Sequence, residues 1–450
     1  MASLANQKTG KLLKSTSIPS NQMAITVPEI SSRGILGDLK NYTSDPIGYL
    51  RRNFEEHGDI YRFRVLHRTL VTTNNPDHVQ HILQENNRNY RKSLAYRKLS
   101  VVLGNGLLTS EGEFWLRQRR MSAPAFHKGE IESYQKIMLK ETQQMMDAWD
   151  LQEPINLTTS MTQLTLKIIA RTLLGLSLED KVGKTVEEIL PPGLKFMIKR
   201  ITSPINSPLW LPTRNNRQFS SSMKLLHEII EELITMKEKQ PGDDLLSVLL
   251  SARDDEGKGM THQQLHDEVL TFFLAGHETT AVAASWTIWL LKTNPKVEEK
   301  LRSTFGTEDE STYLQAIIKE SMRLLSPVWI VGREAIGDDQ LGDFKINKGD
   351  SLIFSSYLIH RRHDLWQDAE VFRPERWLEG KPVHKYAYFP FGGGPRLCIG
   401  NHFALQELEV IIKELFSRYK FELEDDSFPG ADYTLTLRPK RPLVARFKMN

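Results

Sequence analysis

The sequence has almost no cysteine: Cys398 is the only one in 450 residues, so no disulfide can form within the chain. Such cysteine usage is typical of a reducing compartment, and we expect a soluble, cytoplasmic protein. The sequence also lacks the run of about 20 apolar residues that a membrane-spanning helix needs, and its N-terminus lacks the apolar segment of a signal peptide. The formal net charge of +3 gives no indication of a nucleic-acid partner.

The chain also lacks internal repeats, low-complexity tracts and linkers that would divide it into separate domains. Its first residues are polar and include Lys8, Lys11 and Lys14, which predicts a flexible N-terminal tail over residues 1–26. We therefore expect a single domain over residues 27–450, without a membrane anchor.

The periodicity of apolar residues changes along the chain. It is strand-like over residues 59–73 and mostly helical from about residue 77 to residue 304. After Pro327 the pattern is mixed: INKGD (residues 346–350) predicts a hairpin turn, and the last residues favour strands again. The sequence thus predicts a mainly α protein with a small β subdomain built from both ends of the chain.

One predicted helix is unusually long. It begins at a capping box formed by Thr261 and Gln264 and can continue to Asn294, which precedes a proline. At about 1.5 Å per residue it would measure roughly 45–50 Å and cross the molecule. Its middle reads AGHETT (residues 275–280), where glycine and threonine weaken a helix and threonine hydroxyls compete for backbone carbonyls. This weakening at the centre indicates a functional site, although a tolerated packing defect explains the same residues.

Histidines offer a competing interpretation as a zinc site. HETTA begins like the zinc motif HExxH, but the position of the second ligand holds Ala281. His360 and His363 have the spacing of one helical face, yet no further ligand candidates cluster near them in the sequence. We therefore expect neither a zinc site nor a zinc hydrolase.

A charged pair interrupts an otherwise apolar helical segment. Glu320 and Arg323 stand three residues apart, so they share a helix face, and large apolar residues surround them. An exposed pair would contribute little to stability, whereas a buried pair requires additional hydrogen bonds. We expect a buried pair to which Arg376 supplies some of those bonds.

The single cysteine lies in a glycine-rich loop, FGGGPRLCIG (residues 391–400). A lone cysteine is most often a small buried apolar residue. Here, however, the loop is the last of five motifs that occur in order: WLRQR, AGHETT, ESMR, PERW and FGGGPRLCIG. From about Gly34 to Phe447 the chain resembles the cytochrome P450 family, the haem-thiolate monooxygenases, on these motifs.

The resemblance implies a cytochrome P450 fold, with haem b between the long central helix and the cysteine loop. Cys398 would be the axial thiolate ligand of the iron, since electron donation from a thiolate favours O–O cleavage. Phe391 would limit water near the sulfur, and Gly394 and Gly400 would let the backbone wrap closely around it. The residues implied to contact the haem propionates or the haem edge are Arg396, Arg119, Trp115, Arg333 and His360.

On the opposite side of the haem, the resemblance implies an oxygen-activating site in AGHETT. Ala275 and Gly276 would leave room for dioxygen. Thr279 would act by hydrogen bonding and Glu278 would relay protons from bulk water, because proton delivery separates productive turnover from loss of peroxide. Ala275 and Thr279 lie four residues apart and so share a helix face.

The implied activity is the insertion of one oxygen atom from O2 into a hydrophobic substrate. The positions that line the substrate pocket in the family are mostly apolar here, which suggests a fatty acid, terpenoid or carotenoid-like substrate; ordinary core packing explains each of them equally well. These positions are Val102, Leu103, Phe272, Phe273, Val328, Trp329, Ile330 and Leu435.

Electrons would come from separate proteins, a ferredoxin or flavodoxin with its NAD(P)H reductase, since we expect no fused redox module. Arg117 and Arg120 would form part of a basic docking face, although a solvated helix face explains them as well. We expect a monomer. Two alternatives stay open: a peroxide-driven peroxygenase or isomerase, which the presence of Glu278 and Thr279 disfavours, and a non-enzymatic haem-thiolate sensor or carrier, which would not need that pair.

Overall fold

The computed structural model describes residues 24–31, 34–176, 196 and 208–449. Most of the expected tail, including its three lysines, lies outside the described residues. Its end is described: strand β1 (Ile25–Thr26) pairs in parallel with Phe344 and Lys345. The tail prediction is therefore wrong for these two residues, because backbone pairing holds them in a sheet.

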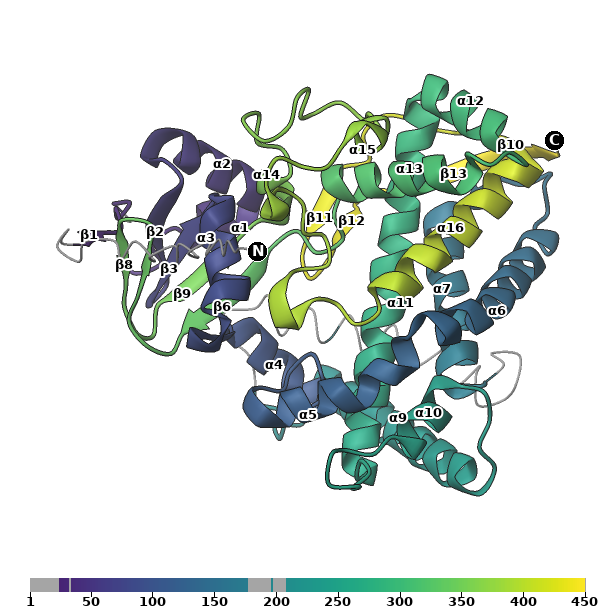
Figure 1. The fold of residues 1–450 in the computed structure, drawn as a ribbon, viewed down its shortest axis with the longest axis horizontal. Helices are drawn as coiled ribbons and strands as arrows, with labels where there is room; N and C mark the ends of the chain where they lie inside the picture. Colours follow the sequence, from purple (N-terminus) through teal and green to yellow (C-terminus); the bar gives the residue numbers. More distant parts are fainter. Residues whose placement is uncertain (1–23, 32–33, 177–195, 197–207, 450) are drawn as a thin grey trace, which may run out of the picture.

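The described chain is mainly helical, as predicted, with the largest sheet at one side and the long helices at the other (Figure 1). The helices are α1 (Leu39–Ser44), α2 (Pro46–His57), α3 (Pro76–Gln80), α4 (Leu94–Leu103), α5 (Gly112–Ser122), α6 (Lys128–Asp147), α7 (Leu157–Leu174), α9 (Arg214–Lys239), α10 (Leu245–Ser251), α11 (His262–Thr293), α12 (Pro295–Thr304), α13 (Glu310–Leu324), α14 (Ser356–Ile359), α15 (Arg376–Glu379) and α16 (Asn401–Arg418).

The strands of the described residues form small sheets. The largest has the order β2-β3-β9-β6-β4, and smaller ones have the orders β1-β8-β7, β10-β13-β5 and β11-β12. The strands not yet given bounds are β2 (Ile60–Val65), β3 (Arg68–Thr73), β4 (Tyr90–Lys92), β5 (Ile155–Asn156), β6 (Val331–Ala335), β7 (Asp339–Leu341), β8 (Phe344–Ile346), β9 (Ser351–Phe354), β10 (Tyr419–Leu423), β11 (Ala431–Tyr433), β12 (Leu437–Pro439) and β13 (Val444–Met449).

Two predictions about the strands need correction. INKGD is a turn, with Gly349 at a φ of 89°, but it is not a hairpin: β8 pairs with β1 and β7, whereas β9 pairs with β3 and β6. The β subdomain does combine early strands with residues 331–354, yet the C-terminal strands lie in separate sheets, one of which includes β5. Alternation along the chain predicts strands, but it does not identify their partners.

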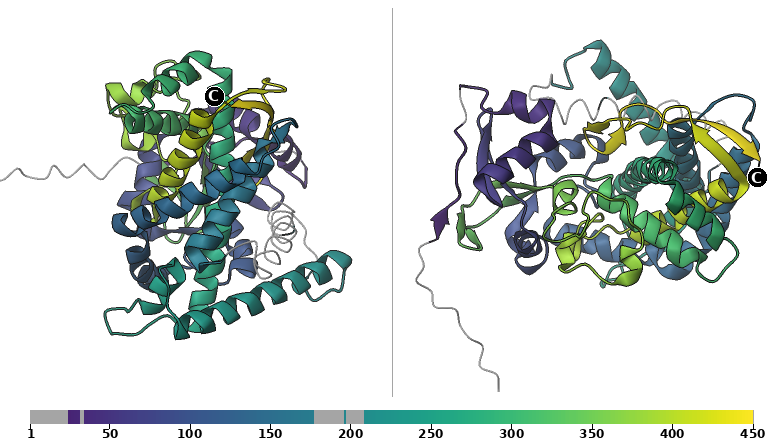
Figure 2. Two further views of the ribbon diagram at one scale, coloured as in Figure 1. Left: turned by 90° about the vertical axis from the view of Figure 1, so that its right-hand side faces the viewer. Right: turned by 90° about the horizontal axis from the view of Figure 1, so that it is seen from above.

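Helix α11 runs through the centre of the helical side. It packs against α7, α9, α13 and α16, and Figure 2 (right) shows it end-on among its neighbours. The predicted capping box is confirmed: the Thr261 hydroxyl accepts the N–H of Gln264, and the Gln264 side chain accepts the N–H of Thr261. The helix ends at Thr293, and most of its residues are buried, which matches its largely apolar sequence.

None of the helices in the described ranges is both long and apolar enough to cross a membrane.

Candidate functional site

The cysteine loop folds back on itself beside α11 and leads into α16. The backbone N–H of Cys398 donates to the carbonyl of Phe391 at 3.0 Å, and the N–H of Leu397 donates to the carbonyl of Gly394 at 3.1 Å. Gly394 has a φ of 61°, and a Cβ atom there would lie 1.8 Å from the carbonyl oxygen of Leu83. Only glycine fits this position, because the backbone of the loop touches the backbone of residue 83.

Cys398 is accessible, and several groups around its thiol act on its pKa. Burial raises the pKa of the thiol; the N–H of Gly400 and the charge of Arg119 act in the opposite direction. Helix α16 begins at Asn401, so its positive N-terminal end also faces this region. A thiolate that binds a metal ion needs such surroundings.

A group of buried and partly buried basic side chains lies next to the loop. The Arg396 guanidinium stacks on the ring of Trp115 at 3.6 Å and forms an ion pair with Glu111. Burial lowers the pKa of Arg396 to about 10; the repulsion from Arg333 and Arg119 adds to this effect, and Glu111 opposes it. The structure thus brings together four residues that the sequence placed around the haem: Arg396, Trp115, Arg333 and Arg119.

Lys92, at the end of β4, is a member of this group that the sequence reasoning missed. Its ammonium group donates to the carbonyls of Leu107 and Ser110 at 3.0 and 3.1 Å. Burial, followed by repulsion from Arg396, lowers the pKa of Lys92 to about 7. Lysine is rarely buried, so nothing in the sequence distinguished this lysine from its exposed neighbours.

The basic group fits the two propionates of a haem. Lys92, Arg119 and Arg333 form no ion pair with a carboxylate within the described part of the chain, while Glu111 pairs with Arg396. Buried cations without anions are costly, so this excess of positive charge calls for negative charge from a ligand. Together with the accessible sulfur, the residues present fit a haem.

On α11, hydroxyl groups bind three consecutive carbonyls in AGHETT, the stretch where the sequence predicts a weakened helix. Thr279 donates to Ala275 at 2.8 Å, Thr280 to Gly276 at 3.0 Å, and Thr165 of α7 to His277 at 2.9 Å. The helix nevertheless stays continuous from His262 to Thr293. These hydroxyls satisfy the carbonyls in a stretch where the helix has poor helix formers.

Ala275 is exposed, although the residues just before it on α11 are buried. One face of the central helix is therefore open at the position where dioxygen is expected. Gly276, unlike Ala275, faces a neighbouring helix: a Cβ atom there would be 3.1 Å from Cδ1 of Ile169 on α7. The missing side chain at Gly276 lets the two helices approach each other.

The Glu278 carboxylate points to the C-terminal hairpin. The hydroxyl of Thr436 donates to Glu278 Oε1 at 2.8 Å, and Arg438 Nη1 lies 3.9 Å from the same oxygen. Sequence reasoning identified Glu278 but had no signal for its two partners, which lie about 160 residues away in the chain.

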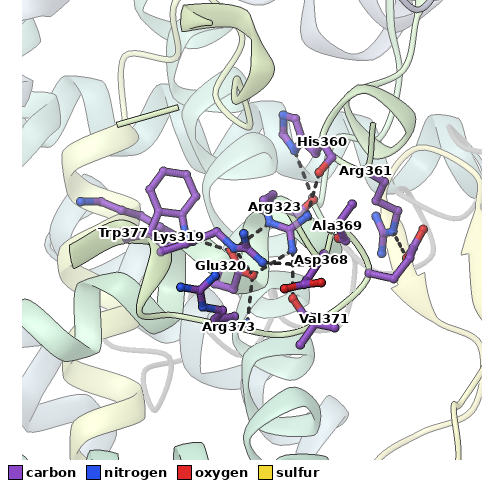
Figure 3. A network of polar contacts seen from close by, with 12 residues as sticks. Lys319, Glu320, Arg323, His360, Arg361, Asp368, Ala369, Val371, Arg373 and Trp377 are labelled. Carbon is purple, nitrogen blue, oxygen red and sulfur yellow. Dashed lines mark hydrogen bonds and ion pairs between the residues drawn. The ribbon is translucent and has the colours of Figure 1, made fainter. Parts of the chain in front are cut away.

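Glu320 and Arg323 are fully buried at the centre of a network of polar contacts, the Glu320 cluster, whose other members include Arg373, Arg376 and Trp377 (Figure 3). Glu320 receives two hydrogen bonds from Arg323, at 2.8 and 2.9 Å. The expected contact with Arg376 is present at 2.9 Å, and the indole N–H of Trp377 and the backbone N–H of Arg373 complete the set at 2.9 and 3.0 Å. Every lone pair of this buried carboxylate therefore has a donor, which is what a buried charge requires.

Arg323 also joins the cluster to the chain that leads to the cysteine loop. Its guanidinium donates to the carbonyls of His360, Ala369 and Val371 at 2.8, 2.6 and 3.2 Å (Figure 3). These bonds fix the backbone of residues 360–371 relative to α13.

His360 belongs to this cluster and not to the basic group around the haem. Its Nδ1 donates to the carbonyl of Arg323 at 3.2 Å, and its Nε2 accepts the N–H of Phe389 at 2.9 Å. Burial and the nearby Arg323 charge lower the pKa of His360 to about 3. Since both ring nitrogens are bonded to backbone groups, the expectation that His360 contacts a propionate is corrected: no polar atom of the ring is left for it.

The expected pocket residues come from α4, α11, the segment after α13 and the C-terminal hairpin. Phe272 packs edge-on against Phe126 at 5.2 Å, and Trp329 packs against Tyr433 at 5.5 Å. The buried ones are Val102, Leu103, Phe272, Phe273 and Trp329, and the partly buried ones are Val328, Ile330 and Leu435.

The two arginines expected in a docking face differ from each other. Arg117 binds Asp254 at 2.6 Å and the carbonyl of Gly259 at 3.0 Å, so it holds the turn before α11. Arg120 remains mostly exposed, with a loose contact to Asp255 at 3.4 Å. Only Arg120 therefore offers a charge to a partner.

The accessible cysteine sulfur, the basic group beside it and the open face of α11 define a haem-thiolate protein. The comparison with known families agrees: the Cytochrome P450 family model matches residues 28–446. The chain belongs to the cytochrome P450 family and is a cytochrome P450 monooxygenase, which implies a haem-thiolate cofactor.

Bacterial relatives match most of the chain. Cyclooctatin synthase of Streptomyces melanosporofaciens is 32% identical over 407 residues, which covers 86% of this chain and 87% of the relative. Putative cytochrome P450 132 of Mycobacterium bovis is 31% identical over 448 residues, covering 93% and 92%. Pentalenene oxygenase of Streptomyces avermitilis is 27% identical over 386 residues, covering 82% and 86%.

Proposed function

We propose that this monooxygenase oxidises an apolar small molecule of the fatty-acid, terpenoid or carotenoid-like class. The observation that carries the proposal is the open face of α11: Ala275 is exposed and Thr279 lies one turn further on, while Phe272 and Phe273 precede them. An apolar substrate would lie against this face. The name of one relative, pentalenene oxygenase, supports an apolar substrate.

Cys398 is the proposed axial ligand, and its haem would supply the iron chemistry that activates dioxygen. The N–H of Gly400 and the charge of Arg119 favour the thiolate form of the sulfur. Arg396, Arg333 and Lys92 would bind the propionates. Phe391, half-buried at the start of the loop, would keep water from the sulfur.

Thr279 and Glu278 are the proposed proton-handling residues. In the structure the Thr279 proton is held on the carbonyl of Ala275, so the hydroxyl oxygen is free to accept a further hydrogen bond. Glu278 is the adjacent acid on the same helix, and its carboxylate would pass protons from water toward Thr279.

We also propose that electrons come from a separate ferredoxin or flavodoxin with its NAD(P)H reductase. Arg120, exposed on α5 in the same helix as Trp115, supports a basic docking surface on this side of the molecule.

A reduced carbon-monoxide difference spectrum of the purified protein and of Cys398→Ser tests the axial ligand. We expect the red-shifted Soret band of a thiolate complex in the wild type and its loss in the variant. A wild type without that band would overturn the assignment.

The substrate class is tested by titrating the protein with fatty acids, terpenoids and carotenoids. A member of the correct class should displace water from the iron and shift its spin state. For Thr279, the Thr279→Ala variant should keep its haem and divert reducing equivalents to hydrogen peroxide. Thr280→Ala is the matched control, because its hydroxyl makes the same kind of bond to the next carbonyl, that of Gly276, and Thr280 is buried. Equal peroxide release from both variants would contradict the role of Thr279.

A further inference from the structure

The hairpin formed by β11 and β12 lies against α11 (Figure 1). Two of its side chains converge on one carboxylate oxygen: the Thr436 hydroxyl donates to Glu278 Oε1 at 2.8 Å, and Arg438 Nη1 lies 3.9 Å from it. No hydrogen bond within the described residues engages the other oxygen, Oε2. One oxygen of the carboxylate is thus fixed, and the other is available for proton exchange.

The backbone C=O and N–H groups of Leu437, the residue after Thr436, are both hydrogen-bonded, and these bonds set the position of Thr436. The indole N–H of Trp286 on α11 donates to the carbonyl of Leu437 at 2.6 Å, and the N–H of Leu437 donates to the carbonyl of Pro327 at 2.8 Å. Strand β12 therefore cannot slide along α11 without breaking these bonds, and the Thr436 hydroxyl, which is buried, is held at a defined distance from Glu278.

Arg438 links the buried end of this arrangement to solvent. Its Nε lies 3.3 Å from Asp432 Oδ2, across the hairpin. The side chains of Asp432 and Arg438 are 36% and 38% exposed, whereas that of Glu278 is 14% exposed. These three polar groups form a continuous line from the surface to α11.

The hairpin also carries a residue of the proposed substrate pocket. Leu435 stands directly before Thr436, in the turn between the two strands. Any shift of this turn by a bound substrate would therefore move the hydroxyl that holds Glu278.

We propose that Thr436 and Arg438 are positioning residues for Glu278, which hold its carboxyl group in the orientation that delivers protons to Thr279. This inference rests on the proposed function of Glu278 and Thr279. In each delivery a proton leaves the Glu278 carboxyl group toward Thr279 and a proton from water replaces it, while Arg438 stays charged and Thr436 keeps its own proton.

The first test measures whether Thr436 and Glu278 are coupled in the folded holoprotein, independently of turnover. A double-mutant cycle of Thr436→Val and Glu278→Ala, followed by denaturant unfolding, should give a coupling of about tenfold in the unfolding equilibrium constant, as expected for a hydrogen bond to a charged group. Thr436→Ser, which keeps the hydroxyl, should restore most of it. A coupling below about twofold would overturn the contact.

The second test measures proton delivery. NADPH-driven oxygen consumption with an excess of a ferredoxin and its reductase is compared in H2O and D2O. Thr436→Val and Arg438→Met should lower the rate about three- to tenfold and increase the solvent isotope effect, in the range that a general acid contributes. Lys440→Met, the adjacent exposed cation on the hairpin, is the control for Arg438→Met and should match the wild type.

The outcomes separate this inference from the function on which it rests. If the wild type lacks the thiolate carbon-monoxide spectrum, the proposed function fails. If the wild type shows that spectrum and Thr279→Ala releases peroxide, but Thr436→Val and Arg438→Met keep the wild-type rate and isotope effect, the positioning role alone is overturned. Coupling in the unfolding cycle without any change in the isotope effect also overturns it, because the contact would then be only structural.

Discussion

The Nε2 atom of His360 accepts a hydrogen bond from the backbone N–H of Phe389 at 2.9 Å, two residues before the cysteine loop begins. Its Nδ1 atom donates to the carbonyl of Arg323 at 3.2 Å. One imidazole ring therefore joins the buried Glu320 cluster to the segment that carries Cys398. The ring thus bonds the end of α13 to the segment that leads into the cysteine loop.

We expect His360 to make the stability of the protein pH-dependent. Its pKa is about 3 in the folded state, and it is about 6.5 in an unfolded chain. Below pH 6.5 the unfolded state binds a proton that the folded state does not, so the free energy of unfolding decreases as the pH falls. From pH 7 to pH 5 this residue should account for a loss of about 2 kcal/mol, measured by denaturant unfolding.

His360→Gln should abolish that part of the loss, because an amide can replace both hydrogen bonds without titrating. His363→Gln is the control, since His363 is exposed. Identical pH dependence in the wild type and His360→Gln would contradict the prediction.

A pair of tryptophans isolates the contribution of one hydrogen bond in the Glu320 cluster. Trp377 donates to the Glu320 carboxylate at 2.9 Å, whereas the indole nitrogen of Trp366 is buried without a hydrogen-bond partner in the residues described. Both Trp→Phe changes remove the same atoms. Trp377→Phe should therefore lower the free energy of unfolding by about 1.5–3 kcal/mol more than Trp366→Phe, as expected for a hydrogen bond to a charged group. Equal losses would mean that the ring volume alone matters.

Alanine substitutions at two glycines of the cysteine loop distinguish the effect of backbone strain from the effect of a steric clash. Gly392 and Gly394 both have positive φ, at 73° and 61°. A Cβ atom at Gly392 would meet nothing within 4 Å, but one at Gly394 would lie 1.8 Å from the carbonyl of Leu83. Gly392→Ala should cost roughly 1 kcal/mol and keep its haem. Gly394→Ala should purify with little haem, measured as the ratio of haem to protein. Similar haem contents in the two variants would refute the clash.

Features that depend on residues close together in the sequence could be predicted from it. The bounds of α11 follow from the capping box at Thr261 and the proline after Asn294, and the cysteine loop from its glycine pattern. The contact between Glu320 and Arg376 was expected because a buried carboxylate needs several donors, and the structure shows it.

Features that depend on how distant parts of the chain come together could not be predicted from the sequence. The alternation of apolar residues does not identify which strands pair. The sequence therefore predicts a hairpin at INKGD, whereas the strands on either side of this turn lie in different sheets. The burial of Lys92 and the role of His360 depend on which residues fold around them, and the contact of Glu278 with Thr436 joins residues that no local pattern relates.

Lys92 provides the last prediction, which concerns haem binding. Its pKa is about 7 because burial and the charge of Arg396 outweigh the opposing effect of Glu111 and Glu268, neither of which forms an ion pair with it among the described residues. A propionate beside Lys92 would favour the charged form, so its pKa rises when haem binds and a proton is taken up above pH 7. Haem affinity should therefore fall between pH 7 and pH 9, by up to about tenfold per pH unit.

Lys92→Met should weaken haem binding at pH 7 and flatten this dependence, because the variant has neither the charge nor the titrating group. Transfer of haem from the protein to an apoglobin measures both effects. Lys381→Met removes an exposed lysine and should leave the curve unchanged. Parallel pH curves for the wild type and Lys92→Met would show that the lysine is not beside a propionate. A steeper curve for the wild type would show that the buried cation completes its ion pair only when haem is bound.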